Sequence, residues 1–121
     1  MKLHASGEDY LEAVLVLQLE KGMVRSVDIA RHMEVSKPSV CHVVASLKEG
    51  GFLTMADDFS LHLTDLGRKV AEQTYEKHRF FTARLIAAGV SPETAEQDAC
   101  RIEHVVSAET YERLKALVDS K

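Results

Sequence analysis

Apolar residues recur at intervals of three and four along most of the chain, which is the spacing that places them on one face of a helix. Residues that favour helix N-termini stand before these stretches, and glycines follow several of them. The pattern predicts helices over Gly7–Glu20, Val27–Met33, Ser36–Leu47, Asp65–Ala87, Pro92–Val106 and Ala108–Asp119. The residues expected to cap or open them are Ser6, Ser26, Ser36, Thr64, Ser91 and Ser107.

Two short strand-like runs interrupt the helical spacing. Phe52–Met55 and Ser60–Thr64 are separated by the turn-forming segment Ala56–Phe59, which predicts a small hairpin of the kind called a wing. Before it, two short helices joined at Glu34 form a helix-turn-helix pattern, with Ser36–Leu47 as the recognition helix. We therefore expect a mainly α protein, with a winged helix-turn-helix domain over residues 1–64 and a helical domain over residues 65–121.

Length and composition narrow the class of protein. The 121 residues fit one compact domain or two very small ones. No apolar run is long enough to span a bilayer, and Met1–His4 leads into an amphipathic helix rather than a signal peptide, so we expect a cytoplasmic protein without a membrane partner. In that reducing compartment Cys41 and Cys100 are expected to be free thiols. The net charge of -4 counts against nucleic acid as a partner, but DNA affinity depends more on where Lys and Arg cluster.

One run of residues near the C-terminus carries metal-binding chemistry. Cys100, Glu103 and His104 stand at i, i+3 and i+4, so a thiolate, a carboxylate and an imidazole project from one helix face. Asp9 and Glu12 lie one turn apart in the first helix, and His78 lies within the long fourth helix. Such donors from three distant segments are what a divalent transition ion needs to tie the segments together. The sequence therefore predicts a metal-sensing protein.

With these residues laid out, the chain resembles the diphtheria toxin repressor family and its manganese-responsive branch, which are metal-activated winged-helix repressors. The resemblance covers nearly the whole chain. It rests on five segments: E-D-Y-L-E at 8–12, S-K-P-S-V at 36–40, L-T-D-L-G at 63–67, K-H-R-F-F-T-A-R-L at 77–85 and A-C-R-I-E-H-V-V-S at 99–107.

This resemblance implies a DNA-binding repressor of metal-homeostasis genes, whose helical C-terminal domain binds the metal and dimerises. The implied ligands are Asp9, Cys100, Glu103 and His104, with Glu12 and His78 matching ligands of the manganese branch. The chain is a hybrid, because the manganese branch usually has a carboxylate in place of Cys100. The iron branch usually has Met in place of Asp9 and a basic residue in place of Glu12.

Mixed sulfur, nitrogen and oxygen ligation suits Fe2+ well, and Mn2+ stays open because selectivity follows availability and geometry. Zn2+ is expected to bind in vitro. The number of ions per subunit also stays open, as do two alternative roles: Glu12 as a solvated helix carboxylate, and Glu96 as a ligand of an ancillary site.

The DNA-facing residues are expected on the recognition helix, whose outward positions are Lys37, Ser39, Cys41, His42 and Ser46. The resemblance points to Pro38 and Ser39 near base methyls or sugars, and to His42 where the iron branch has a base-reading Gln. Because these side chains are small, we expect a large share of phosphate contacts. Those contacts are assigned to Ser36, Lys37, Lys48, Arg25 and Arg31, with His62 supporting the wing. The expected partners are a palindromic duplex operator and a second copy of the chain.

Two other classes of function are weighed against the repressor. One is a winged-helix regulator that answers to a small organic ligand or to thiol oxidation, but a redox switch would pair nearby cysteines, and Cys41 and Cys100 fall in different halves. The other is an enzyme using Cys100 with His104. No Gly-rich turn offers an oxyanion hole near them and no third group is in evident reach, so we expect no catalytic activity.

Overall fold

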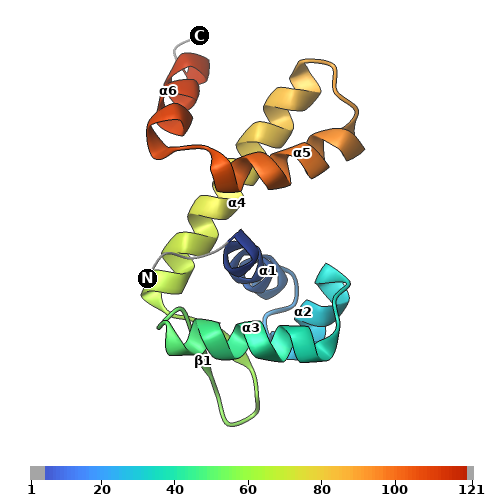
Figure 1. Cartoon of the computed structure of the whole chain (residues 1–121), viewed down its shortest axis with the longest axis vertical. Helices are drawn as coiled ribbons and strands as arrows, with labels where there is room; N and C mark the ends of the chain where they lie inside the picture. The colour runs from blue at the N-terminus through green and yellow to red at the C-terminus, as the bar shows by residue number, and fades with distance from the viewer. Residues whose placement is uncertain (1–4, 120–121) are drawn as a thin grey trace. The chain divides into compact units, whose positions relative to one another are not determined.

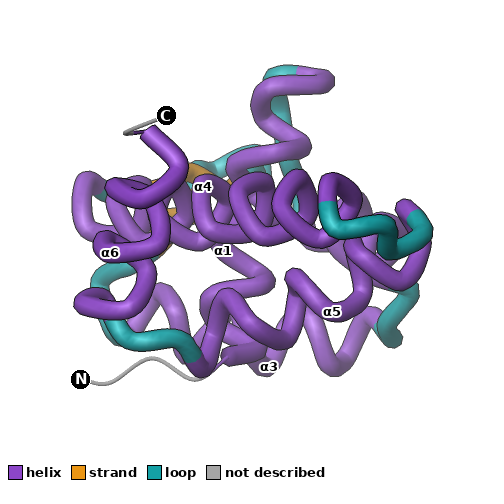
Figure 2. Tube along the Cα trace, turned by 90° about the horizontal axis from the view of Figure 1, so that it is seen from above, coloured by secondary structure: helices purple, strands orange, loops and turns teal. Residues whose placement is uncertain are grey.

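The structure is a computed structural model, and it describes residues 5–119. The chain divides into two compact units, residues 1–74 and 75–121, and the division falls inside the long helix α4 (Asp65–Ala87). Figure 1 shows the order of the elements, and Figure 2 shows how much of the described chain is helical. The expected mainly α fold with a two-stranded wing is confirmed.

The first unit is a winged helix-turn-helix. It contains α1 (Ala5–Lys21), α2 (Ser26–Met33), α3 (Lys37–Glu49), β1 (Leu53–Met55), β2 (Leu61–Leu63) and the start of α4. The strands pair antiparallel, with Leu53 opposite Leu63 and Met55 opposite Leu61. Side chains from every one of these helices and strands meet in the core, where the largest fully buried ones are Leu11, Val14, Val24, Ile29, Val40, Leu53 and Leu61.

Local hydrogen bonds explain where α3 and α4 begin. Ser36 caps α3, since its side chain accepts a bond from the backbone amide of Ser39 at 3.3 Å. Thr64 does the same for α4, accepting from the amide of Gly67 at 3.0 Å. The helix-turn-helix pattern leaves Val40, Val44 and Leu47 buried on one face of α3, so its opposite face is available to a partner.

Two of the expected N-caps are wrong. Ser6 lies inside α1, and Ser26 is the first residue of α2 rather than its cap. The N-cap of α2 is Arg25, whose backbone amide donates to Oδ2 of Asp28 at 2.8 Å. A carboxylate three residues into the helix satisfies this amide, so the helix starts one residue before Val27.

The second unit contains the C-terminal part of α4, α5 (Pro92–Val105) and α6 (Ala108–Asp119). Its core is built on Phe81, Ala99 and Tyr111, with Phe80, Ile102 and Val106 packed around them. Phe80 meets both Phe81 and Tyr111 edge to face, at centroid distances of 5.2 and 5.5 Å.

A polar contact closes one side of this core. Glu76 of α4 accepts hydrogen bonds from the hydroxyl of Tyr111 at 2.9 Å and from Nζ of Lys115 at 2.7 Å. Burial and the Glu76 carboxylate together raise the pKa of the Tyr111 phenol above its ordinary value, so the hydroxyl stays a donor. Among the described residues, no helix is long and apolar enough to cross a membrane.

Candidate metal centre and nucleic-acid interface

The predicted metal ligands of α5 lie together in the second unit. Donor atoms of Cys100, Glu103 and His104 lie within 4.8 Å of one another. The helix that carries them begins at Pro92 behind the cap Ser91, and its buried stripe is Ala95, Ala99 and Glu103. Two small residues and a carboxylate therefore share the inward face, and Glu103 is only 3% exposed.

His78 of α4 joins this group within the second unit. Its Nδ1 atom lies 3.0 Å from Oε2 of Glu103, while Nε2 of His104 lies 3.3 Å from Oε1 of the same carboxylate. Each oxygen of the buried carboxylate thus faces an imidazole nitrogen. Glu96, one α5 turn before Cys100, places Oε1 at 3.7 Å from Nε2 of His78, and its side chain is 70% exposed.

These donors fit a divalent transition ion. A buried carboxylate is costly unless a positive charge or hydrogen bonds compensate it, and here it lies beside two imidazoles and a thiol. Imidazole and thiolate ligands suit Fe2+, Zn2+ and related ions, whereas Mg2+ and Ca2+ prefer sites built from oxygen alone. Metal binding is therefore the chemistry that this cluster supports.

Asp9 and Glu12 belong to α1 of the first unit. They stand three positions apart on one helix face, and both are half-buried. Their part in metal binding stays a prediction, because it rests on the sequence resemblance.

The residues predicted to face DNA lie on the surface of the first unit. Every expected outward position of α3 is exposed, as are the expected phosphate contacts: Ser36, Lys37, Pro38, Ser39, Cys41, His42, Ser46, Lys48, Arg25 and Arg31. Ser36 is already engaged in its cap, and its Oγ lies 2.8 Å from Oγ of Ser39. These placements agree with a DNA-reading face, and the DNA contact of each residue stays a prediction.

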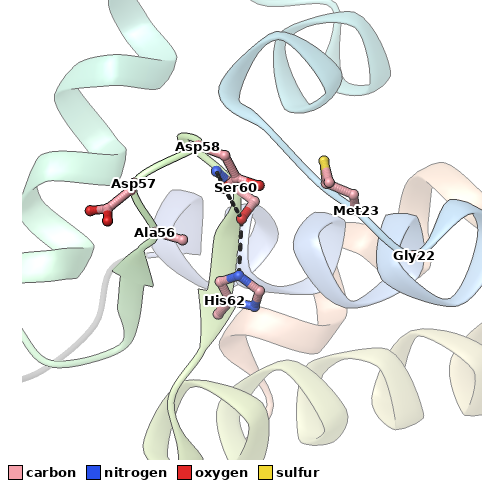
Figure 3. Close-up of a pocket in the computed structure, with 7 residues that line it drawn as sticks. All are labelled: Gly22, Met23, Ala56, Asp57, Asp58, Ser60 and His62. Atoms are coloured by element: carbon pink, nitrogen blue, oxygen red, sulfur yellow. Dashed lines mark hydrogen bonds between the residues drawn. The ribbon is translucent and has the colours of Figure 1, made fainter.

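A hydrogen-bond network at the wing was not predicted from the sequence. Asp58 accepts from the amide and the hydroxyl of Ser60, at 3.0 and 2.6 Å, and the Ser60 hydroxyl lies 3.0 Å from Nε2 of His62 (Figure 3). Ser60 is buried although it is polar. The signal was present, since an Asp side chain in a turn commonly accepts a hydrogen bond from the backbone amide two residues later.

Comparison with known proteins follows this geometry. Residues 2–60 match the family model "Iron dependent repressor, N-terminal DNA binding domain", and residues 64–120 match "Iron dependent repressor, metal binding and dimerisation domain". The first match ends and the second begins in the segment just before α4. The two compact units instead divide within α4, between residues 74 and 75. The expected boundary at 64/65 stays a prediction.

Three similar proteins illustrate the match. The transcriptional regulator MntR of Salmonella typhimurium is 38% identical over 109 residues, which are 90% of this chain and 69% of that protein. The diphtheria toxin repressor of Corynebacterium diphtheriae is 36% identical over 115 residues, 93% of this chain and 50% of that protein. The solved structure of the manganese regulator SloR superposes with a TM-score of 0.85 at 26% identity, covering all of this chain and 56% of that one.

The chain thus spans about half the length of two of these proteins and two thirds of the third. The chain matches the models of both family domains, the DNA-binding domain and the metal-binding and dimerisation domain. Its structure contains the corresponding helix-turn-helix and helical unit. The chain belongs to the iron-dependent repressor family, which consists of DNA-binding transcriptional regulators and not of enzymes.

Proposed function

We propose that this chain is a metal-activated repressor that works in the cytoplasm as a homodimer on a palindromic operator. The observation that carries the proposal is the buried carboxylate of Glu103, which lies beside His78, His104 and Cys100. Burying a carboxylate costs free energy that packing alone does not return. Together with the neighbouring imidazoles and thiol, it provides the donor atoms that a divalent transition ion prefers. The family's DNA-binding and dimerisation domains supply the other two parts of the proposal.

Fe2+ and Mn2+ are the two candidate activators. The matching family models are named for iron, and the SloR regulator is named for manganese. A thiolate at Cys100 favours Fe2+ over Mn2+, since the affinity of such a site for divalent ions rises from Mn2+ to Fe2+ and soft ligands select the later ions. Zn2+ binds such donors more tightly still in vitro, which makes affinity alone a poor guide to the physiological ion.

Asp9 and Glu12 are proposed to complete the ligand set from α1. This step rests on the sequence resemblance and on their shared helix face. Ligation by residues of both units would restrict the angle between them. A two-fold dimer must place its recognition helices about 34 Å apart to enter successive major grooves, so a small restriction of angle changes DNA affinity strongly. The strength of activation equals the difference in metal affinity between the DNA-competent and incompetent states.

The test is an anaerobic selection from a random duplex pool with chelator, Mn2+, Fe2+ or Zn2+. We expect a palindrome to be recovered with at least one ion and not with chelator. The ranking of ions by recovery then separates Fe2+ from Mn2+.

Equal recovery with chelator would contradict metal activation. It would favour the alternative of a winged-helix regulator that responds to a small organic ligand or to thiol oxidation. A non-palindromic site recovered with metal would contradict only the two-fold operator.

A further inference from the structure

The wing of the first unit carries negative charge where DNA binding would favour positive charge. Asp57 and Asp58 are consecutive and exposed in the hairpin loop, within the matched DNA-binding domain. Carboxylates close to phosphates weaken DNA binding by repulsion. Electrostatics alone therefore predicts that removing either charge strengthens binding, unless one of these residues has another role.

Asp58 differs from Asp57 in its contacts. Its carboxylate accepts from the amide and hydroxyl of Ser60, and its backbone carbonyl accepts from Nε of Arg25 at 3.1 Å. The two hydrogen bonds from Ser60, chiefly the one from its hydroxyl, hold the pKa of the Asp58 carboxyl below its ordinary value. Asp57 makes no hydrogen bond among the described residues, and Figure 3 shows it pointing away from Ser60.

The segment that carries Arg25 is fixed on both sides. The amide of Leu61 in β2 donates to the carbonyl of Val24 at 2.7 Å, which ties the wing to the residue before Arg25. The amide of Arg25 donates to Asp28 at the start of α2. With its backbone held and its Nε engaged by Asp58, the planar guanidinium keeps a defined direction. The other guanidinium nitrogens of Arg25 make no hydrogen bond within residues 5–119, so they remain available to a phosphate.

We propose that Asp58 is a positioning residue for DNA binding, which holds the wing turn through Ser60 and thereby aims the exposed Arg25 at the DNA backbone. This inference rests on the proposed DNA-binding function. An arginine that is ordered before binding loses less conformational freedom when the complex forms. Asp58 thus strengthens DNA binding even though its own charge opposes it.

The His62 ring belongs to the same network. The Ser60 hydroxyl has one hydrogen and donates it to Asp58, so it must accept from Nε2–H of His62. The depression beside this network has a volume of about 580 Å³ and is lined by Gly22, Met23, Ala56, Asp57, Asp58, Ser60 and His62. Through Arg25, Asp58, Ser60 and His62, the hydrogen-bond network runs from the N-terminus of α2 to the second strand of the wing.

The experiment measures DNA affinity as a function of salt for the full chain, with Mn2+ and, anaerobically, with Fe2+. The duplex has about 30 base pairs, long enough for two half-sites. Asp58→Ala is expected to lower affinity about threefold to tenfold, the range for an arginine that must be ordered on binding. The slope of log affinity against log salt should fall by up to about 0.9, the value for one lost phosphate contact. Asp58→Asn keeps the acceptor for Ser60, so it should bind as tightly as the wild type or more tightly.

Two further comparisons separate positioning from general destabilisation. Asp57→Asn is the matched control, since it removes the same charge from the neighbouring residue and should leave affinity equal or higher. In an Arg25→Ala background, Asp58→Ala should cause no additional loss, because the residue that it positions is already gone.

An Asp58→Ala variant that binds as well as the wild type would overturn the inference. So would an equal loss with and without Arg25, which would indicate a role in folding alone. If the wild-type chain binds no duplex with any ion, the proposed function fails as well, so the two failures are distinguishable.

Discussion

Asp28 shows how a single carboxylate joins two helices of the DNA-binding unit. Its Oδ1 atom lies 2.7 Å from Nζ of Lys21 at the end of α1, and its Oδ2 accepts from the amide of Arg25 before α2. The side chain is 13% exposed, so water screens these contacts only in part. The hydrogen bond from Lys21 is the main reason that the pKa of Asp28 lies below its ordinary value of 3.8.

This arrangement predicts a pH-dependent contribution to stability. Because the folded-state pKa is lower than the unfolded one, the contribution is complete above the unfolded pKa and is lost as pH falls through the folded pKa. Asp28→Asn should therefore lower the free energy of unfolding by about 0.5–1 kcal/mol near neutral pH, a modest value because Lys21 is half exposed. Urea unfolding, followed by circular dichroism at about pH 7 and about pH 3, measures the difference between variant and wild type.

The deficit of Asp28→Asn should shrink at the lower pH. Asp57→Asn provides the comparison, since that exposed residue makes no hydrogen bond within the described part of the chain and should show no deficit at either pH. A deficit of equal size at both pH values would show that the carboxylate charge is not its source.

At the scale of elements, the start of α4 is fixed against the turn that precedes β1. Thr64 donates its hydroxyl to the carbonyl of Gly51 at 2.6 Å, and its amide donates to the carbonyl of Phe52 at 3.2 Å. Gly67, in the first turn of the helix, lies so close that a Cβ atom there would be 2.0 Å from the Phe52 carbonyl oxygen. Backbone on both sides of this contact leaves no flexible side chain to move aside.

Gly67→Ala is therefore expected to destabilise the protein. In an exposed helix this substitution would stabilise by about 1 kcal/mol, but the clash should reverse the sign and cost about 1–3 kcal/mol. Thermal unfolding should show a Tm lower by several degrees. Ala83→Gly, at an exposed position of the same helix, is the control, since it should show the ordinary loss of about 1 kcal/mol from a helix glycine. A higher Tm for Gly67→Ala would mean that the close approach does not exist.

The same elements show what local sequence can predict. The helices Asp65–Ala87 and Ala108–Asp119 have the expected bounds. Their starts were predictable because the capping residues Thr64 and Ser107 act within one turn of the chain. The predicted start of α2 was wrong because Ser26 and Asp28 both offer capping oxygens, and the sequence does not show which one acts. In the structure Asp28 accepts from the backbone amide of Arg25. The need for glycine at position 67 depends on an approach between segments that no local pattern encodes.

At the scale of the whole molecule, the candidate metal cluster was predictable in part. Cys100, Glu103 and His104 follow from helical spacing, and the structure brings their donor atoms together. The contact between His78 and Glu103 joins residues 25 positions apart, so helical spacing cannot give it. The donor chemistry and the family resemblance indicated only that His78 belongs to the same ligand set. No spacing rule relates Asp9 and Glu12 to α5, so their metal-binding role stays a prediction.

Substitution of the predicted metal ligands of α5 provides the decisive test of how metal and DNA binding are linked. Cys100→Ser and His104→Ala should each weaken metal binding by tenfold or more, by analogy with the roughly 10- to 100-fold losses that weaker changes around metal sites cause. Both side chains lie at the cluster, while the core of the second unit rests on Phe81, Ala99 and Tyr111, so the fold should persist. Fluorescence anisotropy of a labelled duplex, with and without the ion, should show that the metal-dependent gain in affinity is lost.

Gln97→Ala, exposed on the same helix, should retain that gain. A full metal response in both ligand variants would exclude this cluster as the sensor, because an ion acts on DNA affinity only through the residues that bind it.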